Sequence, residues 1–323
     1  MTTSCSMPAT ERGPALLAWY ARHARDLPWR RRHDAYAIWI SEIMLQQTQV
    51  RTVVPRYTAW LARFPDTAAL ARAESAEVMK AWEGLGYYRR ARMLHEAARI
   101  IVRDHAGVFP SAFADILALP GIGRSTAGAI ASFCFAARTP VLDGNVKRVI
   151  RRWHDTGVPD GELWALAQQA IDDAPDAAAW NQAMMELGAT HCGPRKAECA
   201  ACPVSTACAS AFRAQIIPGK AIPVRDVHWR VELHTCPERG LWLTQRPSTG
   251  IWAGLWAPPI RELTAAPDET PAHVHALTHR RLHLYAAAPD TEPAGDGRWF
   301  SSLDEAALPT GIRRLLATQG MPA

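Results

Sequence analysis

Four cysteines crowded into seventeen residues constrain this chain more than any other feature of its sequence. They are separated by six, two and five residues, at Cys192, Cys199, Cys202 and Cys208. Four thiolates in one compact loop are enough to hold a cubane iron–sulfur cluster. Zinc also accepts four thiolates, but structural zinc sites usually use two tight pairs, which this spacing does not match. We therefore expect a 4Fe-4S cluster that staples the loop and presents Arg195 and Lys196 to phosphate.

The periodicity of apolar residues predicts helices throughout the first two-thirds of the chain. From about residue 15 to residue 213, apolar side chains recur at helical spacing, as in 93–101, and Gly107 is a plausible end for that helix. Similar stripes run through 50–64, 75–82 and 164–171. Strand-like alternation is missing from this part of the sequence. We therefore expect an all-helical domain over 15–213, after a polar tail at 1–14.

A second domain follows a linker rich in proline and glycine at 214–227. Residues 231–235 and 241–244 flank Pro237-Glu-Arg-Gly240, which predicts a β-hairpin. Further strands are expected at 273–285 and 298–300, with a closing helix at 310–319. The length of 323 residues agrees with two domains of ~150 residues each. The fold class is therefore multi-domain: an all-α domain joined to a small α+β domain at 228–323.

The charge pattern suits a polyanionic partner for the first domain. The chain carries a net charge of +5, and residues 225–323 hold 10 basic and 11 acidic residues, so the whole excess lies before them. An alanine- and arginine-rich composition can also reflect genomic base composition. No apolar run approaches the ~20 residues of a membrane span, and the first residues form no secretory signal. We expect no membrane partner and a cytoplasmic location, at the nucleoid if the source is bacterial.

A glycine-rich turn is the second chemical signal. Leu119-Pro-Gly121-Ile-Gly123 precedes a helix that starts near Ser125, so its free backbone N–H groups can bind a phosphate. Turns use Pro-Gly-x-Gly routinely. With helices on both sides, however, the sequence reads as a helix-hairpin-helix, a motif that grips the DNA backbone without reading sequence.

Two carboxylates stand in polar surroundings. Asp143 precedes a helix that begins near Val146, which is typical of an N-cap aspartate or of an ionised carboxylate close to bound DNA. Glu42 lies in Trp39–Gln49, where Ser41 could cap the helix and Glu42 could favour its positive end. The polar run Gln46-Gln47-Thr48 interrupts the apolar stripe there, which is natural for a surface that meets base edges.

These motifs, in this order, closely resemble the MutY family of adenine DNA glycosylases. That family belongs to the helix-hairpin-helix glycosylase superfamily, which also contains endonuclease III. The resemblance covers about residues 15–260 and includes Gly84-Leu-Gly-Tyr-Tyr88 and Leu142-Asp-Gly-Asn-Val146. It implies a helix-hairpin-helix glycosylase domain with its iron–sulfur loop, followed by a Nudix-like domain. It also implies base excision repair, in which adenine mispaired with 8-oxoguanine or guanine is flipped out of duplex DNA and its N-glycosidic bond is hydrolysed.

The resemblance assigns catalytic roles to three residues. Glu42 matches the acid that protonates adenine N7 and makes the base a better leaving group. Asp143 matches the carboxylate that stabilises the oxocarbenium-like sugar. Asn145 matches a polar residue that positions the carboxylate or the water.

Further matches concern DNA. Gln47 resembles the wedge that fills the gap left by the flipped base, and Tyr87 resembles the aromatic residue that intercalates beside 8-oxoguanine. Lys147 matches a lysine that traps the ring-opened sugar or contacts phosphate. The residues expected to bind DNA are Gln46, Gln47, Thr48, Tyr87, Leu119, Gly121, Gly123, Ser125, Lys147, Arg195 and Lys196.

One position separates this chain from endonuclease III, which carries a Schiff-base lysine just after the hairpin arginine. Ser125 stands at that place, so we expect a monofunctional enzyme that leaves an abasic site. The alternatives are an endonuclease III-like lyase that acts on oxidised pyrimidines and a non-catalytic, redox-sensing DNA-binding protein. The expected partner is double-stranded DNA with A:8-oxoguanine or A:G mispairs, bound by a monomer.

The C-terminal domain resembles the family's lesion-reading module through Leu243-Thr-Gln-Arg-Pro247 and Gly250–Trp256. No glutamate pair follows Arg261-Glu-Leu263, so pyrophosphate hydrolysis is not expected of it. In the family a Phe-Ser-His loop recognises 8-oxoguanine, whereas this chain has Leu277-Thr278-His279. The hydroxyl and the imidazole remain, but the aromatic ring is lost.

Overall fold

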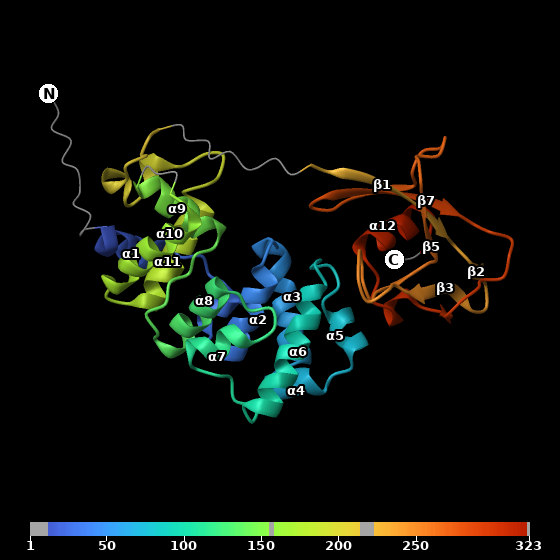
Figure 1. The fold of residues 1–323 in the computed structure, drawn as a ribbon, viewed down its shortest axis with the longest axis horizontal. Coiled ribbons are helices and arrows are strands. Elements are labelled where there is room, and N and C mark those ends of the chain that lie inside the picture. Colours follow the sequence, from blue (N-terminus) through green and yellow to red (C-terminus); the bar gives the residue numbers. More distant parts are fainter. Residues whose placement is uncertain (1–11, 155–157, 214–222, 322–323) are drawn as a thin grey trace. The chain divides into compact units, whose positions relative to one another are not determined.

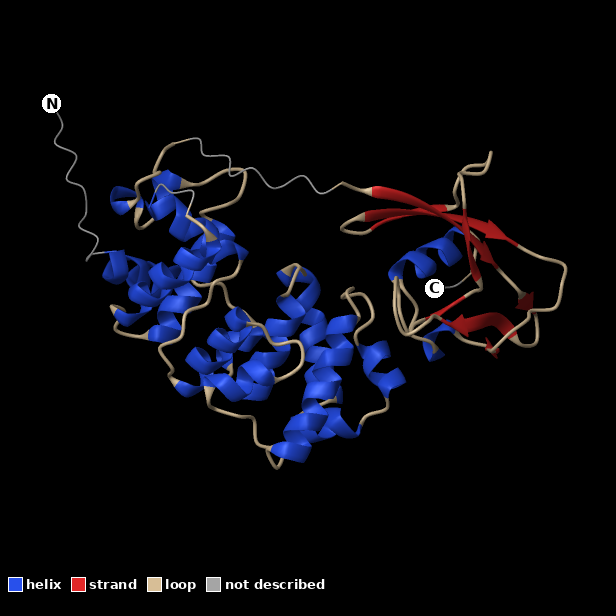
Figure 2. Ribbon diagram, in the orientation of Figure 1, coloured by secondary structure: helices blue, strands red, loops and turns tan. Residues whose placement is uncertain are grey.

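The computed structural model describes residues 12–154, 158–213 and 223–321. The chain divides into two compact units, Met1–Ala68 with Ala97–Gly219 (the helical unit) and Ala69–Glu96 with Lys220–Ala323 (the mixed unit). Helices precede residue 213 and strands follow it (Figures 1 and 2), which confirms the predicted multi-domain class. Most of the predicted tail and linker lies outside the described residues. The other domain boundaries stay a prediction.

Four helices of the first two-thirds of the chain coincide with the predicted apolar stripes at 50–64, 75–82, 93–101 and 164–171. The α-helices are α1 Arg12–His23, α2 Ala35–Leu45, α3 Val50–Arg63, α4 Thr67–Arg72, α5 Ser75–Ala81, α6 Arg89–Asp104, α7 Phe113–Ala118, α8 Arg124–Phe135, α9 Gly144–His154, α10 Asp160–Asp172 and α11 Ala177–Thr190. Short 3₁₀ turns are η2 Pro28–Arg31, η3 Cys199–Ala201 and η4 Ser205–Ala207. As predicted, Gly107 terminates α6: its φ is +79° and its N–H donates to Ile101 O over 3.0 Å.

Helix α2 is apolar on almost every side and lies buried against α3 and α8. The cap interpretation of Ser41 is wrong. Asp34 caps α2 by accepting from Ala37 N at 2.8 Å, whereas Ser41 lies in the middle of the helix and donates to Ile38 O. Helices α1, α9, α10 and α11 pack together around a separate hydrophobic core. Helices α2 and α11 are both largely buried, and both contribute residues to the cavity described below.

The C-terminal part contains two four-stranded sheets with α12 Thr310–Thr318 packed into their shared core. One has the order β5-β1-β7-β6, with β1 and β7 parallel; in the other, β3 pairs with β2, β4 and β8. The strands are β1 Arg225–Glu232, β2 Thr235–Cys236, β3 Gly240–Gln245, β4 Trp256–Ala257, β5 Ile260–Leu263, β6 His273–Ala276, β7 Arg280–Ala287 and β8 Gly297–Phe300, with η5 Leu303–Glu305 before α12.

Two details of this part differ from the prediction. The stretch 273–285 is not one strand, because Leu277 N donates to Arg280 O over 2.8 Å and turns the chain between β6 and β7. The predicted hairpin at Pro237–Gly240 exists between β2 and β3, but 231–232 belongs to β1 in the other sheet. Within the described ranges, no helix combines the length and the hydropathy of a membrane span.

Candidate active site

A cavity of about 190 Å³ in the helical unit brings together residues that are far apart in the sequence. Its walls come from the η2 region, α2 and the turn after it, the end of α8, the start of α9, and α11. The polar lining side chains are Arg25, Arg30, Ser41, Glu42, Thr48, Asp143, Asn145, Gln182 and Glu186. Glu42 and Asp143 lie 101 positions apart in the sequence, yet both line this cavity. Their roles in one active site, as expected from the sequence, require such proximity.

Glu42 has the protonation behaviour of a general acid. Burial on α2, and then the neighbouring charge of Asp143, raise its pKa to about 8. A glutamate carboxyl group normally has a pKa near 4.5. Because the pKa of Glu42 is raised to about 8, Glu42 keeps its proton at neutral pH. A proton donor whose pKa lies near the working pH is well placed for acid catalysis.

Asp143 is held as the N-cap of α9. Its Oδ1 accepts from the backbone N–H groups of Asn145 at 2.9 Å and Val146 at 2.8 Å. The Asn145 amide donates to the other carboxylate oxygen, Oδ2, at 3.4 Å. The two interpretations of Asp143 are thus compatible: one oxygen caps the helix while the carboxylate lines the cavity.

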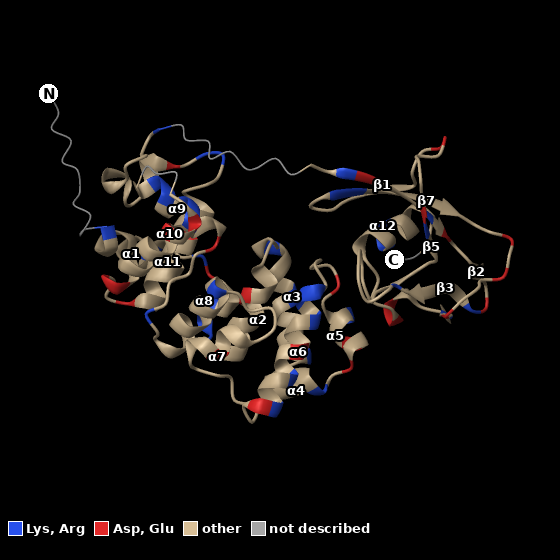
Figure 3. Cartoon of the chain, in the orientation of Figure 1, with Lys and Arg blue, Asp and Glu red and all other residues tan. Residues whose placement is uncertain are grey.

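Arg148, which sequence reasoning missed, ties this carboxylate to the cysteine loop. Its guanidinium donates to Asn145 Oδ1 at 2.8 Å, to Gly188 O at 2.6 Å and to Cys192 O at 2.6 Å. Helix α9 is rich in Lys and Arg residues (Figure 3). The basic run after Asp143 is the signal that could have drawn attention to Arg148.

A buried ion-pair cluster in the cavity lining also went unpredicted. The Glu186 side chain has no exposed area and accepts hydrogen bonds from Arg25 and Arg30 at 2.7 to 2.8 Å. Burial raises the pKa of Glu186, but the bonds from Arg25 and Arg30 outweigh it and hold that pKa at about 2. The cavity lining therefore includes a buried anion paired with two arginine side chains.

The cysteine loop has the donor set of an iron–sulfur site. Burial and the neighbouring thiols of Cys192, Cys208 and Cys199 raise the pKa of Cys202 to about 11, a mutual repulsion that bound iron would relieve. Arg152 donates to Cys192 Sγ at 3.2 Å. Among the described residues, no group of three or more His, Cys, Asp or Glu side chains is arranged around a metal position.

The hairpin residues have unequal access to DNA. Gly121 has φ +80° and Gly123 precedes α8, so the backbone of this turn is free to approach phosphate. Leu119 is only 4% exposed and its backbone N–H and C=O bond Ile116 O and Ile122 N, so it supports the turn from within. Ser125 Oγ accepts from Leu142 N at 3.1 Å, so this side chain supports the segment that leads to Asp143.

The other predicted DNA residues lie at the surface or at its edge. Gln47 is exposed in the turn after α2 with φ +55°, and Gln46 donates to Thr126 at 3.4 Å. Arg195 and Lys196 are exposed. Lys147 donates a hydrogen bond to Asp160.

The predicted lesion-reading residues meet inside the mixed unit. Tyr87, 50% exposed and with φ +46°, shares a hydroxyl–hydroxyl hydrogen bond with Thr278. Thr278 and His279 are exposed in the β6–β7 turn, while Leu277 packs partly against the core. Residues 191 positions apart in sequence thus form one surface.

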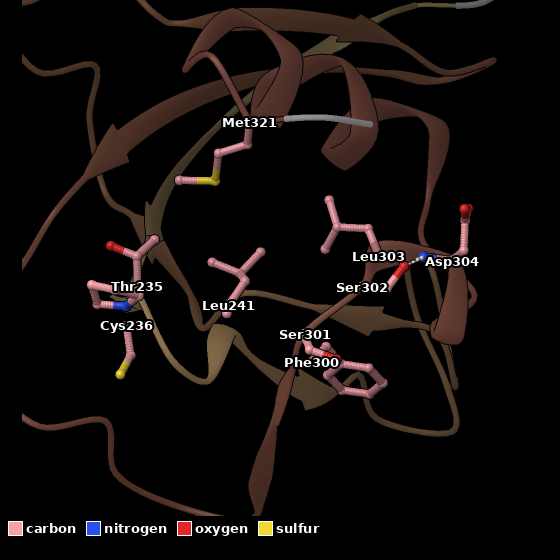
Figure 4. Close-up of a pocket in the computed structure, with 11 residues that line it drawn as sticks. Thr235, Cys236, Leu241, Phe300, Ser301, Ser302, Leu303, Asp304 and Met321 are labelled. Carbon is pink, nitrogen blue, oxygen red and sulfur yellow. Dashed lines mark hydrogen bonds between the residues drawn. The ribbon is translucent and has the colours of Figure 1, made fainter.

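A second cavity, of about 490 Å³, opens in the mixed unit between the β2–β3 hairpin and the segment after β8 (Figure 4). Leu241, Phe300, Leu303 and Met321 make its lining largely apolar. Of the described residues that line it, Asp304 is the one carboxylate. It therefore lacks the clustered acidic ligands that a metal-dependent phosphohydrolase requires.

Family models match both parts of the chain. Residues 40–162 match the HhH-GPD superfamily of base excision DNA repair proteins, and residues 233–318 match the NUDIX domain. The expected helix-hairpin-helix and Nudix-like classes are therefore confirmed.

Relatives named adenine DNA glycosylase occur in distant organisms. The mouse (Mus musculus) protein is 34% identical over 93% of this chain and 76% of its own length. The protein of Buchnera aphidicola (strain Bp) is 35% identical over 76% of this chain and 72% of its own. The human (Homo sapiens) protein is 46% identical over 62% of this chain, and the match spans only 39% of the human sequence.

Solved structures share the helical fold. A thermostable thymine-DNA glycosylase superposes with a TM-score of 0.57 and 29% identity, over 61% of this chain and 93% of that chain. A trapped endonuclease III–DNA covalent intermediate gives 0.54 and 18% identity, over 64% and 98%. The second likeness concerns the fold alone.

Proposed function

Because the chain belongs to the adenine DNA glycosylase family, we propose that it removes adenine paired with 8-oxoguanine or guanine in duplex DNA. The observation that carries the proposal is the cavity in which a protonated Glu42 faces Asp143. A binding protein without catalysis has no need of a carboxylic acid tuned to keep its proton.

In the proposed reaction Glu42 donates its proton to N7 of the flipped adenine, which makes the base a neutral leaving group. The C1′–N9 bond then breaks and positive charge develops on the sugar. Asp143, which keeps a carboxylate oxygen for the cavity beside its cap bonds, stabilises that charge. Asn145 orients the Asp143 carboxylate, and water attack at C1′ completes the hydrolysis.

We infer a monofunctional enzyme from Ser125. A β-elimination lyase needs an amine that forms a Schiff base with the sugar, and the corresponding side chain here is a hydroxyl bound to Leu142 N. Lys147 carries an amine in this region, but that amine pairs with Asp160. The product is therefore an abasic site in an intact strand.

The four clustered cysteines are the proposed ligands of a 4Fe-4S cluster. When bound, the cluster would supply a structural centre that fixes the loop carrying the exposed Arg195 and Lys196. Arg152, which bonds both Cys192 Sγ and Gly193 O, fixes the start of the loop. The predicted monomeric state and cytoplasmic location remain predictions.

The test is single-turnover incubation with duplexes that contain one A:8-oxoguanine pair, one A:G pair or one thymine glycol. We expect adenine release from the first two and strand breaks only after alkali. Cleavage of the thymine glycol duplex without alkali would instead establish the lyase alternative.

A further inference from the structure

We propose that Asn181 is a positioning residue for the Asp143 carboxylate, an inference that rests on the adenine excision proposed above. Asn181 lies on α11 and is only 3% exposed. It touches neither carboxylate of the catalytic pair. Its partners lie instead in the extended segment 137–143 that delivers Asp143 to the cavity.

The Asn181 amide bonds two backbone groups of this segment and one hydroxyl on α8. Its Oδ1 accepts from Val141 N at 3.0 Å, and its Nδ2 donates to Thr139 O at 2.9 Å and to Ser132 Oγ at 3.0 Å. The segment has no regular secondary structure, so its buried polar groups need partners from side chains. One side chain thus fixes two residues of the segment and anchors them to α8.

The segment has little freedom on its other side. A Cβ at Gly128 would lie 2.4 Å from Pro140 O, so α8 and the segment are in direct backbone contact. Ser125 holds the next residue through Leu142 N, and the cap bonds hold Asp143 itself. Asn181 therefore acts at the upstream end of a continuous series of contacts that terminates at the carboxylate.

Helix α11 also forms one wall of the cavity. Gln182, Met185, Glu186 and Ala189 line it, one to eight positions after Asn181. Helix α11 therefore lines the cavity and, through Asn181, also sets the position of the Asp143 carboxylate. If Asn181 is lost, the segment can shift without any change in the pocket wall.

The experiment compares Asn181→Ala with wild type in three assays on the full chain. Single-turnover adenine release from an A:8-oxoguanine duplex measures catalysis. Affinity for the same duplex with a 2′-fluoro sugar, which resists cleavage, measures substrate binding. Affinity for a duplex with a cationic pyrrolidine in place of the sugar measures the interaction of Asp143 with developing positive charge.

We expect excision by Asn181→Ala to slow about 10- to 100-fold, the range that a misplacement near 1 Å produces. Affinity for the pyrrolidine duplex should fall severalfold or more, whereas affinity for the 2′-fluoro duplex should stay within about threefold. The matched control is Ala183→Gly, which loosens the same buried helix without removing a hydrogen bond. It should excise at the wild-type rate.

Three results would overturn the inference: wild-type excision by Asn181→Ala, equal loss of affinity for both duplexes, or equal slowing by Ala183→Gly. If Asn181→Ala does not fold, Ser132→Ala removes one partner of the amide and should still slow excision by about threefold. Wild-type behaviour of Ser132→Ala would then refute the positioning role. Failure of the proposed function shows differently, because the wild type itself would then release no adenine.

Discussion

Replacing Glu42 by glutamine is predicted to stabilise the protein, and to do so increasingly as the pH rises. The pKa of Glu42 lies near 4.5 in the unfolded chain and at about 8 in the folded protein. Between these values the folded state keeps a proton that the unfolded state releases. The free energy of unfolding therefore decreases as pH rises above about 4.5, and the full loss is present above about 8.

The structure gives the size of this effect. A difference between 4.5 and about 8, at about 1.4 kcal/mol per pH unit, corresponds to roughly 5 kcal/mol. This is an upper bound, because Glu42 faces a cavity that admits water. Glutamine cannot ionise, so Glu42→Gln should match the wild type near pH 5 and exceed it by several kcal/mol near pH 9.

The assay is urea unfolding of both proteins at half-unit steps from pH 5 to pH 9. Glu186→Gln is the control, because its carboxylate has the opposite behaviour. With a pKa of about 2 in the folded state, Glu186 contributes its full stability above about pH 4.5 and loses it only in more acidic solution. That variant should be less stable than wild type by a constant amount over pH 5–9. A pH-independent difference between wild type and Glu42→Gln would refute the reasoning.

Three further predictions concern other parts of the site. Arg148→Ala removes the donors that hold Asn145 and the cysteine loop, so it should lower the free energy of unfolding by about 2–3 kcal/mol and reduce iron content, measured by denaturation and metal analysis. Tyr87→Phe removes the hydroxyl that bonds Thr278, and should reduce the preference for 8-oxoguanine over guanine by about fivefold in competition binding. Ser125→Lys places an amine where a lyase carries one, and should produce strand breaks without alkali on a denaturing gel; an intact strand would contradict this.

Local patterns predicted most elements of the fold, because helix spacing and turn residues act within a few positions. The stripe at 50–64 and the stop at Gly107 have such local causes. The stretch 273–285 was misread because Leu277 and Arg280 close a tight turn without glycine or proline to announce it. Ser41 was misread because Asp34 offers an equally good cap seven positions earlier.

Residues of the site could be predicted from the sequence only where they belong to a recognisable motif. Glu42 and Asp143 lie in recognisable runs, whereas the partners of Asn181 are 40 to 49 positions away. Glu186 is a similar case, because its arginines lie more than 150 positions upstream. Local periodicity cannot predict such pairings, since the packing of α11 against α1 and α8 creates them.

The most direct test of the central claim is the amount of adenine released from an A:8-oxoguanine duplex by wild type and by Glu42→Gln. The account predicts release by the wild type, falling at pH values above about 8, and a loss of about 10²- to 10⁴-fold in the variant. Equal release by the two proteins, or tight binding of the duplex by the wild type without any release, would contradict it.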